Sequence, residues 1–115
     1  MDDSKKEYKV IITKPAKNRY FEVLDYVYTH HIVSRAEEIS KELIDFTEKL
    51  TFLPNRGKVE TKLNHRNEMF RFILYKRTEY ATIKIIYYVD EEINTVFITD
   101  YFPTEMIDTK IKNRS

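Results

Sequence analysis

Hydrophobic and polar residues alternate over positions 8–13, and this period of two predicts a short first strand. Over positions 16–30 the apolar residues recur at helical spacing, and Pro15 suits the first turn of that helix. A second apolar stripe follows from position 36 to 50, and the pair Ser34 and Glu37 has the spacing of a capping box at its start. Because only Ile32 and Val33 separate the two patterns, we predict an antiparallel helical hairpin.

Positions 55–68 are polar and without a sustained period, which predicts a long loop with room for a short strand. Three runs rich in β-branched and aromatic residues follow, at 69–76, 80–89 and 95–102, and short polar connections make them a meander. The chain is therefore predicted to be α+β: an N-terminal strand, an antiparallel helical hairpin and a three-stranded antiparallel meander in one sheet (β-α-α-β-β-β). We expect a disordered polar leader at 1–6, one domain over 7–103, and a short helix or flexible tail at 104–115.

Alternation along the meander also predicts which side chains face the helices. The expected core positions are Phe70, Phe72, Leu74, Ile83, Ile85, Tyr87 and Val89. One hairpin covers only one side of a sheet, so the apolar residues of the other side should be exposed as a partner-binding patch. That patch is predicted to contain Ile73, Tyr75, Ile86 and Tyr88, flanked by Arg71 and Lys84.

Composition narrows the possible chemistry. The chain has 115 residues and no Cys, which excludes disulfides and thiolate metal sites, and no His, Asp or Glu set has useful ligand spacing. We therefore expect neither a metal nor a cofactor. No stretch approaches the roughly 20 apolar residues of a membrane span, so a soluble, cytoplasmic protein with no membrane contact is expected.

The charges are unevenly distributed although the net charge is only +1. Positions 56–84 hold eight Lys or Arg against three Glu, a local balance of +5. Such a segment is a candidate footprint for phosphate or for an acidic partner, and an ordinary solvated surface is the alternative.

Several short runs, taken in order, resemble toxins of the RelE/ParE superfamily from bacterial type II toxin-antitoxin (plasmid stabilisation) pairs. These runs are Leu53-Pro54-x-x-Gly57, Phe70-Arg71, Lys84-Ile85-Ile86-Tyr87, Tyr88-Val89-Asp90 and Val96-Phe97-Ile98. The resemblance extends from the first strand to about Pro103. It implies a growth-inhibiting protein that a cognate antitoxin from a neighbouring gene neutralises, with either the ribosome and its mRNA or DNA gyrase as the target.

In the RelE branch, the mRNA interferases, basic residues on the strands hold phosphates during metal-independent cleavage. By position, the resemblance implies catalytic roles for Arg71 and Lys84, and we add Tyr88, or alternatively His65, as a proton relay. The remaining candidates for phosphate or RNA binding are Lys62, His65, Arg66, Lys76 and Arg77, and those for antitoxin binding are Ile73, Tyr75 and Ile86. Two groups of the RelE branch are absent from this chain. Ile73 stands where the branch has a basic residue, and the segment 102–106 lacks the Arg that the branch has near the last strand and tail, so any cleavage should be weak.

Alternatives remain for both the residues and the function. Arg71 and Lys84 could be ordinary surface charges, and Tyr75 and Tyr88 suit a protein contact better than catalysis. Ribosome-dependent mRNA cleavage or A-site binding is the first hypothesis. A gyrase inhibitor without catalysis and a non-toxic protein-binding relative are the others, and a homodimer is compatible with each.

Overall fold

A computed structural model describes residues 7–78, 81–105 and 111 of the chain. The predicted leader at 1–6 and most of the predicted tail lie outside these residues. In chain order the elements are β1 (Lys9–Ile12), α1 (Lys14–His30), α2 (Val33–Glu48), the 3-10 helix η2 (Lys49–Thr51), β2 (Lys58–Val59), the 3-10 helix η3 (Thr61–Leu63), β3 (Arg71–Thr78), β4 (Ala81–Asp90) and β5 (Thr95–Pro103).

The sheet has five strands in the order β1-β5-β4-β3-β2. β1 is parallel to β5, with Lys9 opposite Thr95, and the other neighbours are antiparallel. The α+β class, the hairpin and the meander agree with the prediction, but β2 adds a strand to the predicted four. It pairs only Lys58 with Phe72 and Val59 with Arg71, too short a run for a period of two to be recognised.

The two helices begin in different ways. At α1 the hydroxyl of Thr13 accepts the Ala16 N–H at 3.3 Å, and Pro15 lies in the first turn as predicted. At α2 the predicted capping box is wrong, because Ile32 is the N-cap residue and no side chain caps the helix. The connection is so short that the chain is already helical at Val33, which places Ser34 inside the first turn.

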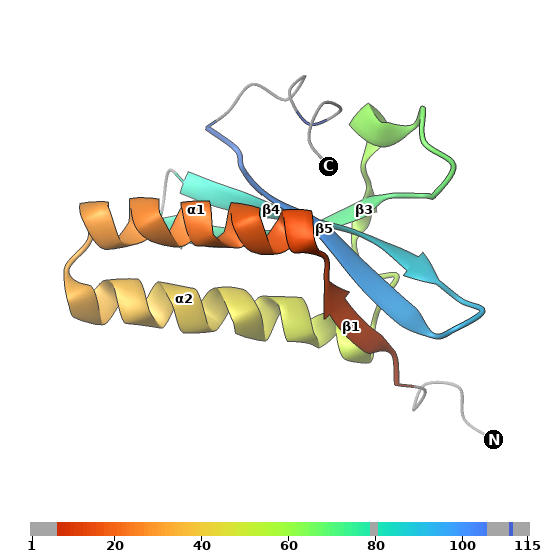
Figure 1. The fold of residues 1–115 in the computed structure, drawn as a ribbon, viewed down its shortest axis with the longest axis horizontal. Coiled ribbons are helices and arrows are strands. Elements are labelled where there is room, and N and C mark those ends of the chain that lie inside the picture. The colour runs from red at the N-terminus through yellow and green to blue at the C-terminus, as the bar shows by residue number, and fades with distance from the viewer. Residues whose placement is uncertain (1–6, 79–80, 106–110, 112–115) are drawn as a thin grey trace.

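The main core lies between the helical hairpin and one face of the sheet. Figure 1 shows α1 and α2 side by side and antiparallel; α1 lies against β5, and α2 contacts β3. Apolar residues of α1, α2, β4 and β5 are fully buried there, including Val27, Ala36, Ile39, Leu43, Ile85, Tyr87, Val96, Ile98 and Tyr101. The apolar stripes predicted for the two helices therefore face the sheet.

The predicted face assignment is right for β4 and wrong for β3. Ile73 lies opposite Ile85, and Tyr75 lies opposite Ile83, so Ile73 and Tyr75 face the helices with them. Phe72 points to the other side, as does Phe70 just before the strand. Along this segment the odd-numbered and the even-numbered positions both carry apolar residues. A shift of one residue in the assumed register therefore exchanges the two faces of the strand.

The far face of the sheet carries a second, smaller core. Leu63 from η3 and Ile111 pack there on Phe70, Ile86 and Phe102. The predicted exposed patch consequently does not form, since Tyr75 is 3% and Ile86 0% exposed. Antitoxin binding through Tyr75 and Ile86 would require an exposed surface that these two residues do not provide, whereas Ile73 is half-buried.

Candidate functional site

A basic groove lies between the end of α2 and the outer part of the sheet. Its volume is about 250 Å³, and its lining residues are Phe46, Lys49, Arg56, Gly57, Lys58, Phe72, Ile73 and Leu74. The side chains of Lys49, Arg56 and Lys58 are exposed, and none of these lining residues is acidic. This combination of clustered cations and apolar surface is suited to an anion with a flat or apolar part.

Gly57 fixes one end of the groove because the backbone approaches the sheet very closely there. Its N–H donates to the hydroxyl of Tyr87 at 3.0 Å, and its carbonyl oxygen accepts a hydrogen bond from the Arg71 guanidinium at 3.0 Å. A Cβ atom at this position would lie 2.5 Å from the Phe72 carbonyl oxygen. The lone glycine of the chain is therefore required by space, which places Arg56 and Lys58 on either side of this contact.

Tyr87 is fully buried beneath the groove, and its surroundings oppose ionisation. Burial raises the pKa of its hydroxyl, although the Gly57 N–H and the cations Arg71 and Arg56 act in the opposite direction. The hydroxyl already accepts the Gly57 N–H. Tyr87 is thus a neutral structural support for the groove at physiological pH.

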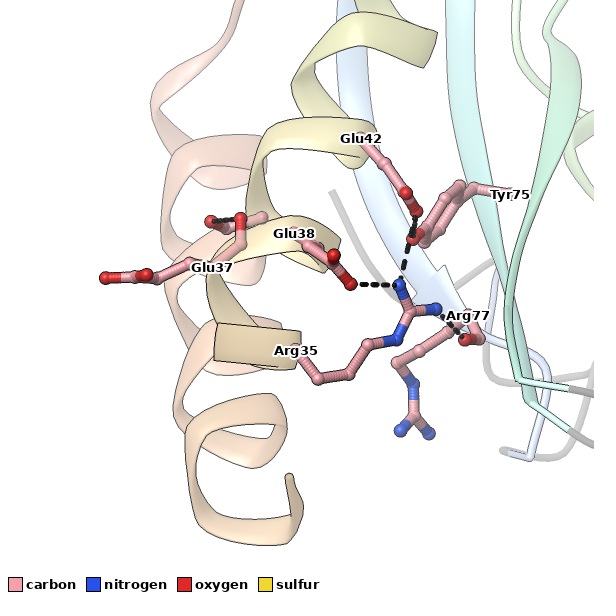
Figure 2. A network of polar contacts seen from close by, with 7 residues as sticks. Arg35, Glu37, Glu38, Glu42, Tyr75 and Arg77 are labelled. Atoms are coloured by element: carbon pink, nitrogen blue, oxygen red, sulfur yellow. Dashed lines mark hydrogen bonds and ion pairs between the residues drawn. The ribbon is translucent and has the colours of Figure 1, made fainter. Parts of the chain in front are cut away.

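The wall formed by α2 is held against β3 by a polar network (Figure 2). Arg35 donates to Glu38 at 3.1 Å and to the carbonyl oxygen of Arg77 at 3.1 Å, and the Tyr75 hydroxyl donates to Glu42 at 2.6 Å. Directly after α2, the ammonium of Lys49 at the start of η2 lies 4.1 Å from the ring centroid of Phe46. The ring of Phe46 also packs edge-on against Tyr75, 5.2 Å between ring centroids, so the same tyrosine links this end of α2 to β3.

The structure separates the two cations predicted to act together. Arg71 faces the groove side beside Gly57, whereas Lys84 points to the far face of the sheet. There Lys84 donates to Glu60 at 2.8 Å, and the two side chains are only 13% and 3% exposed. The prediction that Arg71 and Lys84 share one face is wrong for the same reason as the β3 assignment.

The other predicted site residues are also dispersed. Tyr88 stacks on Phe97 on the far face, 5.2 Å between ring centroids, and borders a cavity of about 210 Å³ with Arg66. Burial, Glu68 and Asp90 raise the pKa of its hydroxyl. Lys62, His65 and Lys76 are exposed, whereas Arg77 is buried at the opposite end of the helical hairpin. These side chains do not converge on one reaction centre.

The groove contains residues that the sequence reading did not select. Arg56 and Lys58 belong to the +5 segment but lack a strand pattern. Lys49 lies near the end of the second predicted helix, seven residues before Arg56 and nine before Lys58. The recognisable signal is the lone Gly57 between two cations, a few residues after the second predicted helix. A glycine in such a place often marks close backbone packing, which orients its neighbours.

Two further observations limit the chemistry. In the described part of the chain, no three His, Asp or Glu side chains gather closely enough to hold a metal ion. Every helix within the described ranges is too short or too polar to cross a bilayer. Comparison with known proteins adds no identity: no protein-family model, no curated protein and no solved structure matches this chain.

Proposed function

We propose that this protein is the toxin of a type II toxin-antitoxin pair, and that it inhibits translation by binding RNA in the ribosomal A site. The observation that carries this proposal is the basic groove with its exposed Lys49, Arg56 and Lys58. Cations that track a phosphate backbone supply most of the affinity for single-stranded RNA, and apolar or aromatic surfaces accept its bases. Phe46 and Leu74 offer such surfaces in the same groove.

Binding is better supported than cleavage. Metal-independent RNA cleavage needs a base for the 2′-hydroxyl, an acid for the leaving oxygen and cations for the phosphorane. Among the described residues that line the groove, none is a His, Asp, Glu or Tyr. The predicted relay residue Tyr88 lies on the far face, where Lys84 is paired with Glu60. We therefore propose inhibition by occupancy, with weak cleavage or none.

The first experiment measures binding of a labelled single-stranded RNA by fluorescence anisotropy across a range of salt concentrations. The variant Lys49→Ala/Arg56→Ala/Lys58→Ala should bind more weakly, and its salt slope should be smaller by about 2, because each phosphate contact contributes about 0.7. The matched control Lys14→Ala/Lys17→Ala/Lys41→Ala removes the same charge from exposed positions of the helices. Equal losses in both variants would attribute binding to net charge and overturn the groove as the site.

The second experiment expresses the chain alone and together with the product of its neighbouring gene, and follows growth, protein synthesis and DNA supercoiling separately. We expect growth and protein synthesis to stop in the first case and to recover in the second. Relaxed or broken DNA with continuing translation would indicate the gyrase mechanism instead. Normal growth at high expression would favour a non-toxic binding protein.

A further inference from the structure

A separate cavity of about 310 Å³ lies between α1 and the ends of β3, β4 and β5. It shares no lining residue with the basic groove. Its walls are mostly apolar, formed by Val23, Tyr26, Ile83, Tyr101 and Pro103. The volume is at the lower end of the range for small-molecule sites, and such sites combine an apolar lining with a few fixed polar groups.

The fixed polar group of this cavity is Arg77. Its side chain is only 8% exposed, and its guanidinium lies 4.9 Å from the ring centroid of Tyr26. One terminal nitrogen lies 3.0 Å from Nε2 of His31, and the other donates to the carboxylate of Glu105 at 3.0 Å. A guanidinium removed from water in this way needs an anion beside it, and its planar fork suits a carboxylate.

Glu105 supplies that anion only loosely. Its side chain is 46% exposed, and it comes two residues after the end of β5. Exposed carboxylates gain little from an ion pair, because water solvates them almost as well. The buried cation is therefore permanent, whereas the carboxylate that covers it can be exchanged for another at small cost.

We infer that this cavity binds a small monocarboxylic acid with an aromatic or branched apolar body. Its carboxylate would replace that of Glu105 on Arg77, and its body would fill the space beside Val23, Ile83 and Tyr101. A single negative charge is favoured, because the other cation that lines the cavity, Arg19, is already paired with Glu22 at 3.2 Å. This ligand site is independent of RNA binding at the basic groove.

The experiment titrates the full chain with 3-phenylpropanoate and, in parallel, with 3-phenylpropanamide. Binding is followed through the methyl chemical shifts of Val23 and Ile83, which lie in the cavity wall. We expect the acid to bind at least about tenfold more tightly than the amide, because only the acid pairs with the buried guanidinium. The absence of methyl shifts at millimolar acid, or equal affinities for acid and amide, would overturn the inference.

The variant Glu105→Gln distinguishes binding at this site from unspecific binding, because it removes the competing carboxylate and retains Arg77. Removing the internal competitor should tighten binding of the acid about two- to fivefold, the equivalent of one exposed ion pair, and leave the amide unchanged. Glu37→Gln is the matched control, since it removes the same charge from an exposed position of α2. Equal effects of the two variants on the acid would show that Glu105 does not occupy the carboxylate position.

Discussion

Replacing Gly57 with alanine tests how closely the segment before β2 packs on the sheet. The new Cβ atom would lie 2.5 Å from the carbonyl oxygen of Phe72 and 2.6 Å from the hydroxyl oxygen of Tyr87. Ordinary contacts of a Cβ atom begin at 3.4 Å, so these neighbours must retreat by nearly one ångström. Neither moves easily, because the first belongs to the β3 backbone and the second to a fully buried side chain.

The expected loss in the free energy of unfolding follows from three contributions. Overpacking of this kind costs about 1–3 kcal/mol. Weakening the hydrogen bond from the Gly57 N–H to Tyr87 adds about 0.5–1.5 kcal/mol. Alanine has less conformational entropy than glycine in the unfolded chain, and this stabilises the folded state by about 0.4–1 kcal/mol. No glycine in the described residues has a positive φ, so backbone strain adds nothing, and the central values of the three contributions give a net loss of about 2 kcal/mol.

Urea denaturation measures this loss directly. With a slope of about 1–3 kcal/mol per molar urea, the midpoint should fall by roughly 1 M, while Asn55→Ala at a neighbouring exposed position should leave it unchanged. Tyr87→Phe removes one of the two obstructing atoms, so Gly57→Ala should cost about 1 kcal/mol less in that background. A Gly57→Ala protein that unfolds at the same urea concentration as Asn55→Ala would refute the close approach.

Three other contacts yield predictions. Lys84→Met should destabilise the fold by about 3 kcal/mol, because it leaves the buried carboxylate of Glu60 unpaired, and adding Glu60→Gln should recover most of that loss in urea denaturation. If Lys84→Met were as stable as the wild-type protein, the result would contradict the buried ion pair between Lys84 and Glu60. Arg35→Ala should lower the free energy of unfolding by only about 1 kcal/mol, measured by thermal unfolding. Its ion pairs are partly exposed, and the hydrogen bond to the Arg77 carbonyl is its main link to β3. A loss near that of Lys84→Met would show a larger role for Arg35. Burial raises the pKa of Tyr101 to about 12 from 10.0, so the folded state retains a proton that the unfolded chain releases, and stability should fall between these pH values. Tyr101→Phe should reduce this fall, and an unchanged pH slope would contradict the assignment.

Periodicity was sufficient for the helices because each has one apolar stripe, and for β4 because the polar Thr82 and Lys84 mark its second face. The stripe containing Ile39 and Leu43 is buried as predicted, and so is the alternation through Ile83 and Ile85 on β4. In β3, by contrast, Phe72 and Ile73 both belong to apolar alternations, so either face could have been the core. The strand register decides, and it depends on pairing with β4 rather than on the β3 sequence alone.

The second core on the far face of the sheet could not be predicted from the sequence, for a different reason. Leu63 is one of only two apolar residues in the polar stretch 55–68, and no period indicates that it reaches Phe70 and Ile86. Its position follows from a short turn, η3, in which the Glu60 side chain accepts the Lys62 N–H at 3.1 Å. Local turns of this kind are set by side-chain to backbone hydrogen bonds, which leave only a weak trace in hydropathy.

The distribution of ion pairs, rather than the +5 balance itself, determines where a polyanion is attracted. Lys84 and Glu60 lie 2.8 Å apart, so beyond about 8 Å, the screening length at physiological salt, they act nearly as a neutral pair. Arg77 is balanced in the same way by Glu105. Lys49, Arg56 and Lys58 form no ion pair with any described carboxylate, and they line one groove. Lys62 and Lys76 are exposed too but do not line this groove, so the groove is the place where three exposed cations act together, and we expect a ligand steered by charge to arrive there first.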